Sequence, residues 1–172
     1  LHGVAGAYFS TPNVVTTWPE LDIRVRTKIN ITSNPNVFLA EKGSTVGSER
    51  VWGFYVASYS NLRFYYFDNT AALVGDISAT ALVSQLIGSR NWFRVTLETT
   101  TGDIKFYTAD GNLEAPAISD YTQLGATVNL AGGATSINVT SAPFASGGYT
   151  NAPTLYPFDG DIYRSQVFNE ID

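Results

Sequence analysis

The chain has 172 residues, and its 15 acidic and 10 basic side chains give a formal net charge of −5 at pH 7, which argues against a nucleic-acid-binding surface. It contains no Cys and a single His, His2, so disulfides, Cys-ligated metal centres, a Ser-His-Asp triad and a His-ligated metal are not expected. No apolar run reaches the roughly 18 residues of a membrane-spanning helix, and the length favours one domain covering residues 1–172.

The first half of the chain is predicted to consist of β-strands. Residues 21–30 alternate between apolar and polar side chains, which indicates an antiparallel sheet with one buried and one solvated face. Residues 71–87 are ambiguous between a loop, an edge strand and a short helix. Further strands are expected at residues 7–9, 37–42, 51–58 and 62–68.

The clearest pattern lies in residues 91–111. Apolar and polar side chains alternate through residues 92–98, and after a turn at 99–103 the alternation resumes as far as Asp110-Gly111, a dipeptide that favours turns. This pattern predicts a β-hairpin. The apolar face of a hairpin needs more strands and a second sheet to cover it.

The last third of the chain is predicted to contain short strands separated by turns. Residues 113–120 are expected to form a loop, and residues 160–169 a long final strand. Short strands are expected at residues 123–130, 136–140 and 144–146. Many short strands with Gly, Pro and Asn turns and little or no helix predict an all-β antiparallel sandwich or jelly roll.

The succession of these segments resembles the concanavalin A-like, laminin-G-like jelly-roll superfamily of lectins and glucanases. It is similar in particular to the domains found in bacteriophage tail, fibre and minor structural proteins. The segments that carry the resemblance are 21–26 (LDIRVR), 39–43 (LAEKG), 92–97 (WFRVTL), 104–111 (IKFYTADG), 124–126 (LGA) and 158–169 (FDGDIYRSQVFN). The resemblance implies two antiparallel sheets, ligand binding at one face or its rim loops, and Ca²⁺ in some members.

Aromatic residues make up the strongest candidate binding site. Their rings could stack on the C–H faces of sugars while polar neighbours bind hydroxyl groups, although large aromatics also fill sandwich cores. In residues 64–67, strand alternation predicts one pair of rings in the core and one pair facing outward. The candidate carbohydrate-binding residues are Trp52, Tyr55, Tyr59, Asn61, Arg63, Tyr65, Tyr66 and Trp92, with Asp68 as a further polar neighbour.

Two sets of acidic residues invite chemical interpretations. Asp159 and Asp161, with Asp110 from another loop, are candidate Ca²⁺ ligands, and the alternative is that they are ordinary turn residues. Glu20 and Asp22 resemble part of the E-x-D-x-x-E motif of laminarinase-type glycosidases, but Val25 replaces the third acid. Without an acid to protonate the leaving group, hydrolysis is not expected.

These features lead to the hypothesis of a non-enzymatic structural or adhesion module on a virion surface, binding host-surface carbohydrate. Its expected partners are other virion proteins and host glycans, with no nucleic acid, no membrane insertion and no cofactor apart from the candidate calcium. The family implies a homo-oligomer. The alternatives are a scaffold or capsid decoration protein without glycan binding, a laminarinase-like glycoside hydrolase, and a secreted location outside a virion.

Overall fold

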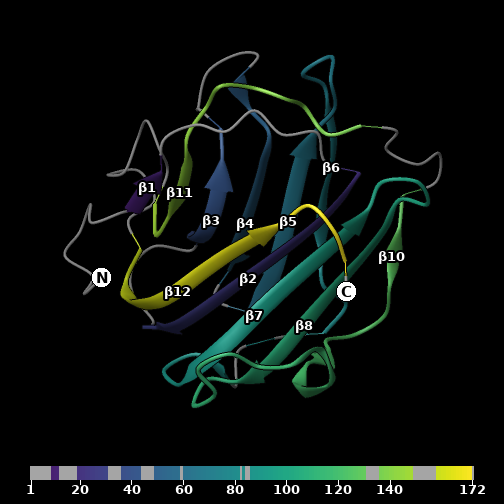
Figure 1. The fold of residues 1–172 in the computed structure, drawn as a ribbon. Helices are drawn as coiled ribbons and strands as arrows, with labels where there is room; N and C mark the ends of the chain where they lie inside the picture. The colour runs from purple at the N-terminus through teal and green to yellow at the C-terminus, as the bar shows by residue number, and fades with distance from the viewer. Residues whose placement is uncertain are drawn as a thin grey trace.

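The computed structural model describes residues 9–11, 19–30, 36–43, 49–58, 60–81, 83, 86–130, 136–148 and 158–171. The chain folds into two antiparallel sheets stacked face to face (Figure 1). The elements are β1 (Phe9–Thr11), β2 (Glu20–Ile29), β3 (Asn36–Lys42), β4 (Trp52–Ala57), β5 (Asn61–Phe67), β6 (Leu73–Ser78), β7 (Arg90–Glu98), β8 (Asp103–Asp110), the 3₁₀ helix η3 (Ile118–Asp120), β9 (Thr122–Gln123), β10 (Val128–Asn129), β11 (Phe144–Ser146) and β12 (Gly160–Phe168).

We call the two layers sheet I and sheet II. Sheet I has the strand order β10-β8-β7-β2-β12, and β9 also pairs with β8. Sheet II has the order β1-β11-β3-β4-β5-β6. The predicted antiparallel sandwich is therefore confirmed, as is the central hairpin, because β7 and β8 pair from Asn91 opposite Asp110 to Glu98 opposite Asp103.

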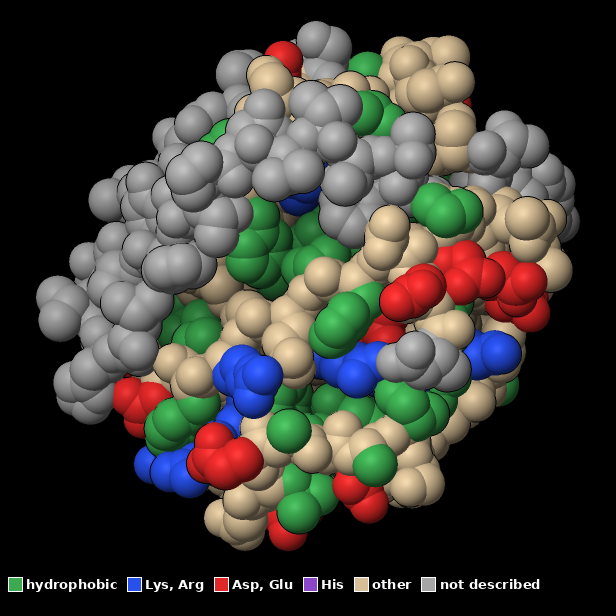
Figure 2. All heavy atoms as spheres, in the orientation of Figure 1, with side chains coloured by type: hydrophobic (Ala, Val, Ile, Leu, Met, Phe, Trp, Pro, Cys, Tyr) green, Lys and Arg blue, Asp and Glu red, His purple; other side chains and the backbone are tan. Residues whose placement is uncertain are grey.

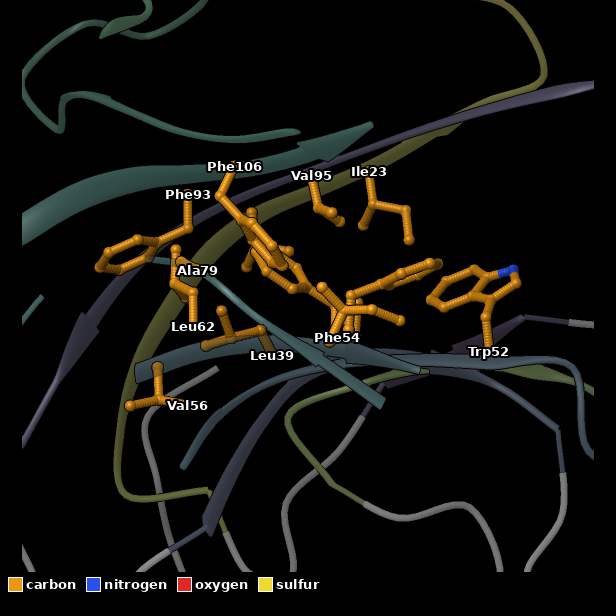
Figure 3. Close-up of a cluster of buried hydrophobic side chains, with 14 of the residues drawn as sticks. Ile23, Leu39, Trp52, Phe54, Val56, Leu62, Ala79, Phe93, Val95 and Phe106 are labelled. Carbon is orange, nitrogen blue, oxygen red and sulfur yellow. The ribbon is translucent and has the colours of Figure 1, made fainter. Parts of the chain in front are cut away.

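The core lies between the two sheets and is built from alternate residues of the strands. Ile23 and Val95 of sheet I point toward Leu39, Trp52 and Phe54 of sheet II (Figure 3). All five side chains are at least 99 % buried. Burial of this many large apolar side chains, each contributing roughly 1.5 to 3 kcal/mol, provides the main driving force for the stacking of the sheets.

Three segments differ from the sequence-based expectation or settle an ambiguity. Residues 123–130, expected to form one short strand, contain only the end of β9 and the two residues of β10, both of which pair with β8. Within the ambiguous residues 71–87, β6 forms the edge strand of sheet II, paired with β5. Residues 136–140, expected to be a strand, form no strand. The reason is that Asn138 crosses the ends of other strands: its backbone N–H bonds to Phe67 O and its side chain to Arg50 O.

The prediction that the polar side of β2 is solvated is wrong. Asp22, Arg24 and Arg26 point away from the core, yet all three are buried. The cause is residues 111–121, which we call the strap, because they fold back over the outward face of sheet I. Arg26 Nε donates to Gly111 O at 2.8 Å, and Trp92 Nε1 donates to Leu113 O at 2.9 Å.

In the face of the molecule that Figure 2 shows, basic, acidic and apolar side chains are interspersed, with no large field of one kind. Within the described ranges, no helix has the length and apolar character needed to cross a bilayer.

Candidate functional site

The outward face of sheet II carries a second cluster of aromatic side chains, separate from the core between the sheets. We call it the aromatic face: Phe38 on β3, Tyr55 on β4, and Tyr65 and Phe67 on β5. The Phe38 and Tyr55 rings stack with centroids 5.0 Å apart, and the Tyr65 and Phe67 rings meet edge to face at 5.9 Å. The alternation predicted for residues 64–67 is confirmed, because Phe64 and Tyr66 belong to the core while their neighbours face outward.

Gly53 on β4 makes room for the Tyr65 ring. The two residues lie opposite each other on neighbouring strands, and a Cβ atom at Gly53 would lie 2.4 Å from Cε1 of Tyr65. A side chain at position 53 would collide with the ring at that distance, so the ring rests directly on the β4 backbone. A glycine inside a strand often marks such a close approach.

Charged groups from β5, β6 and the residue pair before β4 border the aromatic face. Asp76 accepts a hydrogen bond from the Tyr55 hydroxyl at 3.0 Å and pairs with Arg63 Nη2 at 3.0 Å. Both charged side chains are about one third exposed. Arg50 lies over the Phe67 ring, 5.5 Å from its centroid, a geometry typical of a cation–π contact.

A pocket of about 150 Å³ lies between these groups, lined by Arg50, Tyr65, Phe67, Leu73 and Asp76. It is smaller than the roughly 300 to 1,000 Å³ of a pocket that encloses a small molecule, so it suits one face or edge of a ligand. Leu73 is 56 % exposed at its rim. Aromatic rings flanked by a carboxylate and guanidinium groups can bind the apolar face and the hydroxyls of a sugar.

The structure divides the sequence-predicted carbohydrate-binding residues among several places. Tyr55, Arg63 and Tyr65 come together on the aromatic face. Trp52 and Tyr66 are fully buried in the core, where no ligand can stack on them. Asn61 lies at the start of β5, where its amide donates to Ser60 Oγ.

The other candidates lie elsewhere. Trp92 faces outward from sheet I and is fully buried beneath the strap. Asp68 lies in the turn after β5 and accepts hydrogen bonds from Thr70 and Ala72, which hold the pKa of its carboxyl below the usual value. Tyr59 lies outside the described residues.

Sequence reasoning missed four lining residues of the pocket: Arg50, Phe67, Leu73 and Asp76. The alternation in residues 64–67 already placed Phe67 on the same face as Tyr65. Leu73 and Asp76 lie in the segment whose secondary structure was ambiguous, so no pattern indicated which way their side chains point.

The candidate calcium ligands do not converge. Asp110 ends β8, whereas Asp161 lies on β12, and β7 and β2 separate these two strands. Three strand spacings of about 4.8 Å place them roughly 14 Å apart, too far to share one ion. Asp159 accepts a hydrogen bond from Asn30. Among the residues that the structure describes, no group of three or more His, Cys, Asp or Glu side chains could hold a metal ion.

The glycosidase candidate Asp22 is closed off from solvent. Its carboxylate receives hydrogen bonds from both Arg24 and Arg94 and is fully buried. Glu20 lies beside a second pocket, of about 180 Å³, in a cross-strand row with Glu98 and Asp103. The backbone N–H of Ile171 donates to Glu20 Oε2 at 2.7 Å.

No protein-family model and no curated protein matches the chain. Several solved structures share its fold. The CBM40 domain of the Ruminococcus gnavus IT-sialidase, bound to α2,3-sialyllactose, superposes with a TM-score of 0.62 at 13% identity and covers 98% of this chain and 94% of its own.

Two further solved structures are similar to this chain. The LG1-3 region of the laminin α2 chain has a TM-score of 0.62 at 16% identity, covering 95% of this chain and 30% of its own. The SAP-like pentraxin of Limulus polyphemus has a TM-score of 0.56 at 15% identity, covering 98% and 74%. These similarities confirm the concanavalin A-like jelly-roll fold.

Proposed function

We propose that this concanavalin A-like sandwich is a non-enzymatic module that binds carbohydrate on the aromatic face of sheet II. The observation that carries the proposal is the pocket in which the Tyr65 and Phe67 rings meet Arg50 and Asp76. Aromatic rings supply a surface for the C–H face of a sugar, and the charged groups supply donors and acceptors for its hydroxyls.

The similar structures support this proposal through the fold alone, because one fold hosts many functions. The sialidase CBM40 domain is bound to sialyllactose, so this sandwich architecture is compatible with glycan recognition. The specific support comes from the aromatic face. Its Tyr65 ring is partly exposed beside hydrogen-bonding groups, and its other three rings are at most 7 % exposed and hold Tyr65 in place.

The test is a glycan array, followed by calorimetry with the strongest neutral glycan that it identifies. Tyr65→Ala and Asp76→Ala should each lower the affinity at least about tenfold, which corresponds to roughly 1.4 kcal/mol. Tyr163→Ala, which removes an exposed ring from the opposite sheet, is the matched control and should leave that affinity unchanged. An array without any hit, or equal losses in all three variants, would overturn the proposal.

A scaffold role is the second candidate, favoured by the exposure of Leu73 beside the aromatic face. In that case, the face would be covered by another subunit in a virion, and the chain would be a decoration or tail protein. For either role, we propose the surface of a bacteriophage virion as the location of the protein. A cysteine introduced at Leu73 distinguishes the two roles when a thiol reagent is added to the native particle. In the scaffold role, the neighbouring subunit would protect the cysteine from the reagent, whereas a glycan-binding face would leave it reactive.

The absence of catalysis is part of the proposal. Retaining glycosidases use two carboxyl groups about 5 to 5.5 Å apart that reach the substrate, and Asp22 is occupied by two arginines. A reducing-sugar assay on β-glucans should therefore give no product with the wild type. Activity that Glu20→Gln or Glu98→Gln removes would assign hydrolysis to the second pocket.

A further inference from the structure

On the outward face of sheet I, one guanidinium group binds the carboxylate of Glu114 and a second binds its backbone. Arg26 Nη1 lies 2.7 Å from Glu114 Oε1, and Arg164 Nη1 donates to the backbone O of Glu114 at 3.3 Å. The hydrogen bond and charge of Arg26, together with the charges of Arg90 and Arg164, hold the pKa of the Glu114 carboxyl below its usual value. Three basic groups thus act on a single acid.

The two sides of this contact differ in how firmly they are built into the fold. The Arg26 side chain is 5 % exposed and its Nε is fixed on Gly111 O. The Glu114 side chain is 83 % exposed at the tip of the strap. The arginine is therefore preorganised by the sheet, whereas the carboxylate that it binds is a surface group which a carboxylate from solution could replace.

A second acid, Asp161, also lies here and accepts a hydrogen bond from the Tyr163 hydroxyl at 3.4 Å. Within the part of the chain that the structure describes, Arg90 and Arg164 form no ion pair of their own. Arg90 instead lies over the ring of Tyr163, 4.2 Å from its centroid, and Arg26 lies 5.6 Å from the same ring. Tyr163 is 42 % exposed, so an aromatic surface lies next to the arginines.

We propose that Arg26, Arg90 and Arg164 form a second binding site, for the carboxylate of an acidic sugar such as a uronic acid, which Glu114 fills as an internal substitute. Guanidinium groups match carboxylates in geometry and charge, and the Tyr163 ring offers the adjacent sugar ring a stacking surface. This site lies on the opposite sheet from the aromatic face and binds a different class of ligand, so it goes beyond the proposed function.

Competition with Glu114 gives the site a distinctive signature. A tethered group on a short loop acts at an effective concentration on the order of millimolar or above, so it weakens the binding of a free carboxylate. Glu114→Gln removes the competing charge and keeps the shape of the side chain. We expect this variant to bind D-glucuronate about tenfold more tightly than the wild type.

The experiment is a titration of D-glucuronate, with D-glucose as the neutral control, and the NMR shifts of the backbone amides report binding. Three proteins are titrated: the wild type, Glu114→Gln, and Glu114→Gln combined with Arg164→Gln. The single variant should show tighter binding of glucuronate only, and the double variant should lose that gain. Arg164 is exposed, so its replacement should leave the fold intact, which a thermal melt checks.

Three results would overturn the proposal: an unchanged affinity in Glu114→Gln, a gain that persists without Arg164, or binding of N-acetylglutamate amide in preference to glucuronate, which would indicate an acidic peptide as partner. The test is independent of the aromatic face, since adding Tyr65→Ala to Glu114→Gln should leave the gain in place. If the wild type bound no neutral glycan while Glu114→Gln still bound glucuronate, the proposed function alone would be rejected.

Discussion

Asp22 on β2 and Arg94 on β7, 72 residues apart in the chain, form a two-point ion pair on the outward face of sheet I. Arg94 Nε and Nη2 donate to Oδ1 and Oδ2 of Asp22 at 2.9 and 2.8 Å, and the side chains are 2 % and 0 % exposed. Arg24 shares the same carboxylate. This cluster ties the two central strands of the sheet together away from the hydrophobic core.

Asp22→Asn should destabilise the protein strongly. The substitution removes the buried negative charge that Arg24 and Arg94 share, and breaking one side of a buried pair typically costs about 3 to 5 kcal/mol. Urea denaturation at pH 7 measures the loss in the free energy of unfolding.

The matched control is Asp76→Asn, which breaks the pair with Arg63 on the outward face of sheet II. Both partners there are about one third exposed, so the expected loss is below about 1 kcal/mol. Similar losses in the two variants would show that the Asp22 cluster is no more important to stability than a surface pair.

Tyr66→Phe should leave stability unchanged or raise it by up to about 1 kcal/mol at pH 7. The Tyr66 hydroxyl is buried and has no hydrogen-bond partner among the described residues, so removing it relieves a desolvation penalty. A loss of more than about 1 kcal/mol would instead reveal a partner for the hydroxyl. Tyr163→Phe, at an exposed ring, is the control and should change little.

The free energy of unfolding should also depend on pH through the ionisation of Tyr66. Burial, with a smaller contribution from Asp68, raises the pKa of Tyr66 to about 12, whereas the phenol of an unfolded chain ionises near pH 10. Between pH 10 and 12 the folded state therefore holds a proton that the unfolded state loses, and stability falls as the pH rises. Urea denaturation at pH 7 and pH 11 should show a smaller fall for Tyr66→Phe than for the wild type.

The sequence was sufficient to predict the sandwich because strand alternation reports directly on which side chains meet between the sheets. The pattern in residues 91–111 identified the central hairpin, and the pattern in 21–30 identified the core-facing side of β2. Strand alternation could not show that the strap covers the opposite side of β2. One signal was present: Trp92 lies in phase with Arg94 on the polar side of β7, and a tryptophan there indicates cover.

The candidate site was only half predictable for a similar reason. Alternation places Tyr65 and Tyr66 on opposite faces, but it does not say which face is the core. The aromatic residues of β4 and β5 lie on both faces of sheet II, so aromatic content does not distinguish the faces either. The partner Asp76 lies on β6, an edge strand whose weak pattern sequence reasoning left ambiguous. Its pairing with β5 depends on the tertiary structure, which local propensity does not determine.

Gly53→Ala should separate binding from stability. Its Cβ would lie 2.4 Å from the Tyr65 ring, so the ring must move away from the β4 backbone. The displaced group is the free end of a side chain, and we expect a cost of about 1 kcal/mol in the free energy of unfolding. The affinity for neutral glycan should fall as in Tyr65→Ala. Calorimetry beside a thermal melt checks both, and an unchanged affinity would remove Tyr65 from the site.

Trp92→Phe should loosen the strap selectively. The indole N–H of Trp92 is bonded to Leu113 O beneath the strap, and phenylalanine cannot donate this bond, so amide hydrogen exchange in residues 112–121 should accelerate. Trp52→Phe is the matched control, because its indole nitrogen has no hydrogen-bond partner among the described residues and the residue belongs to the core. It should lower global stability without favouring exchange in the strap. Equal acceleration in both variants would mean that the strap is held by the sandwich as a whole, and Glu114 would then be no easier to displace from Arg26 than any core contact.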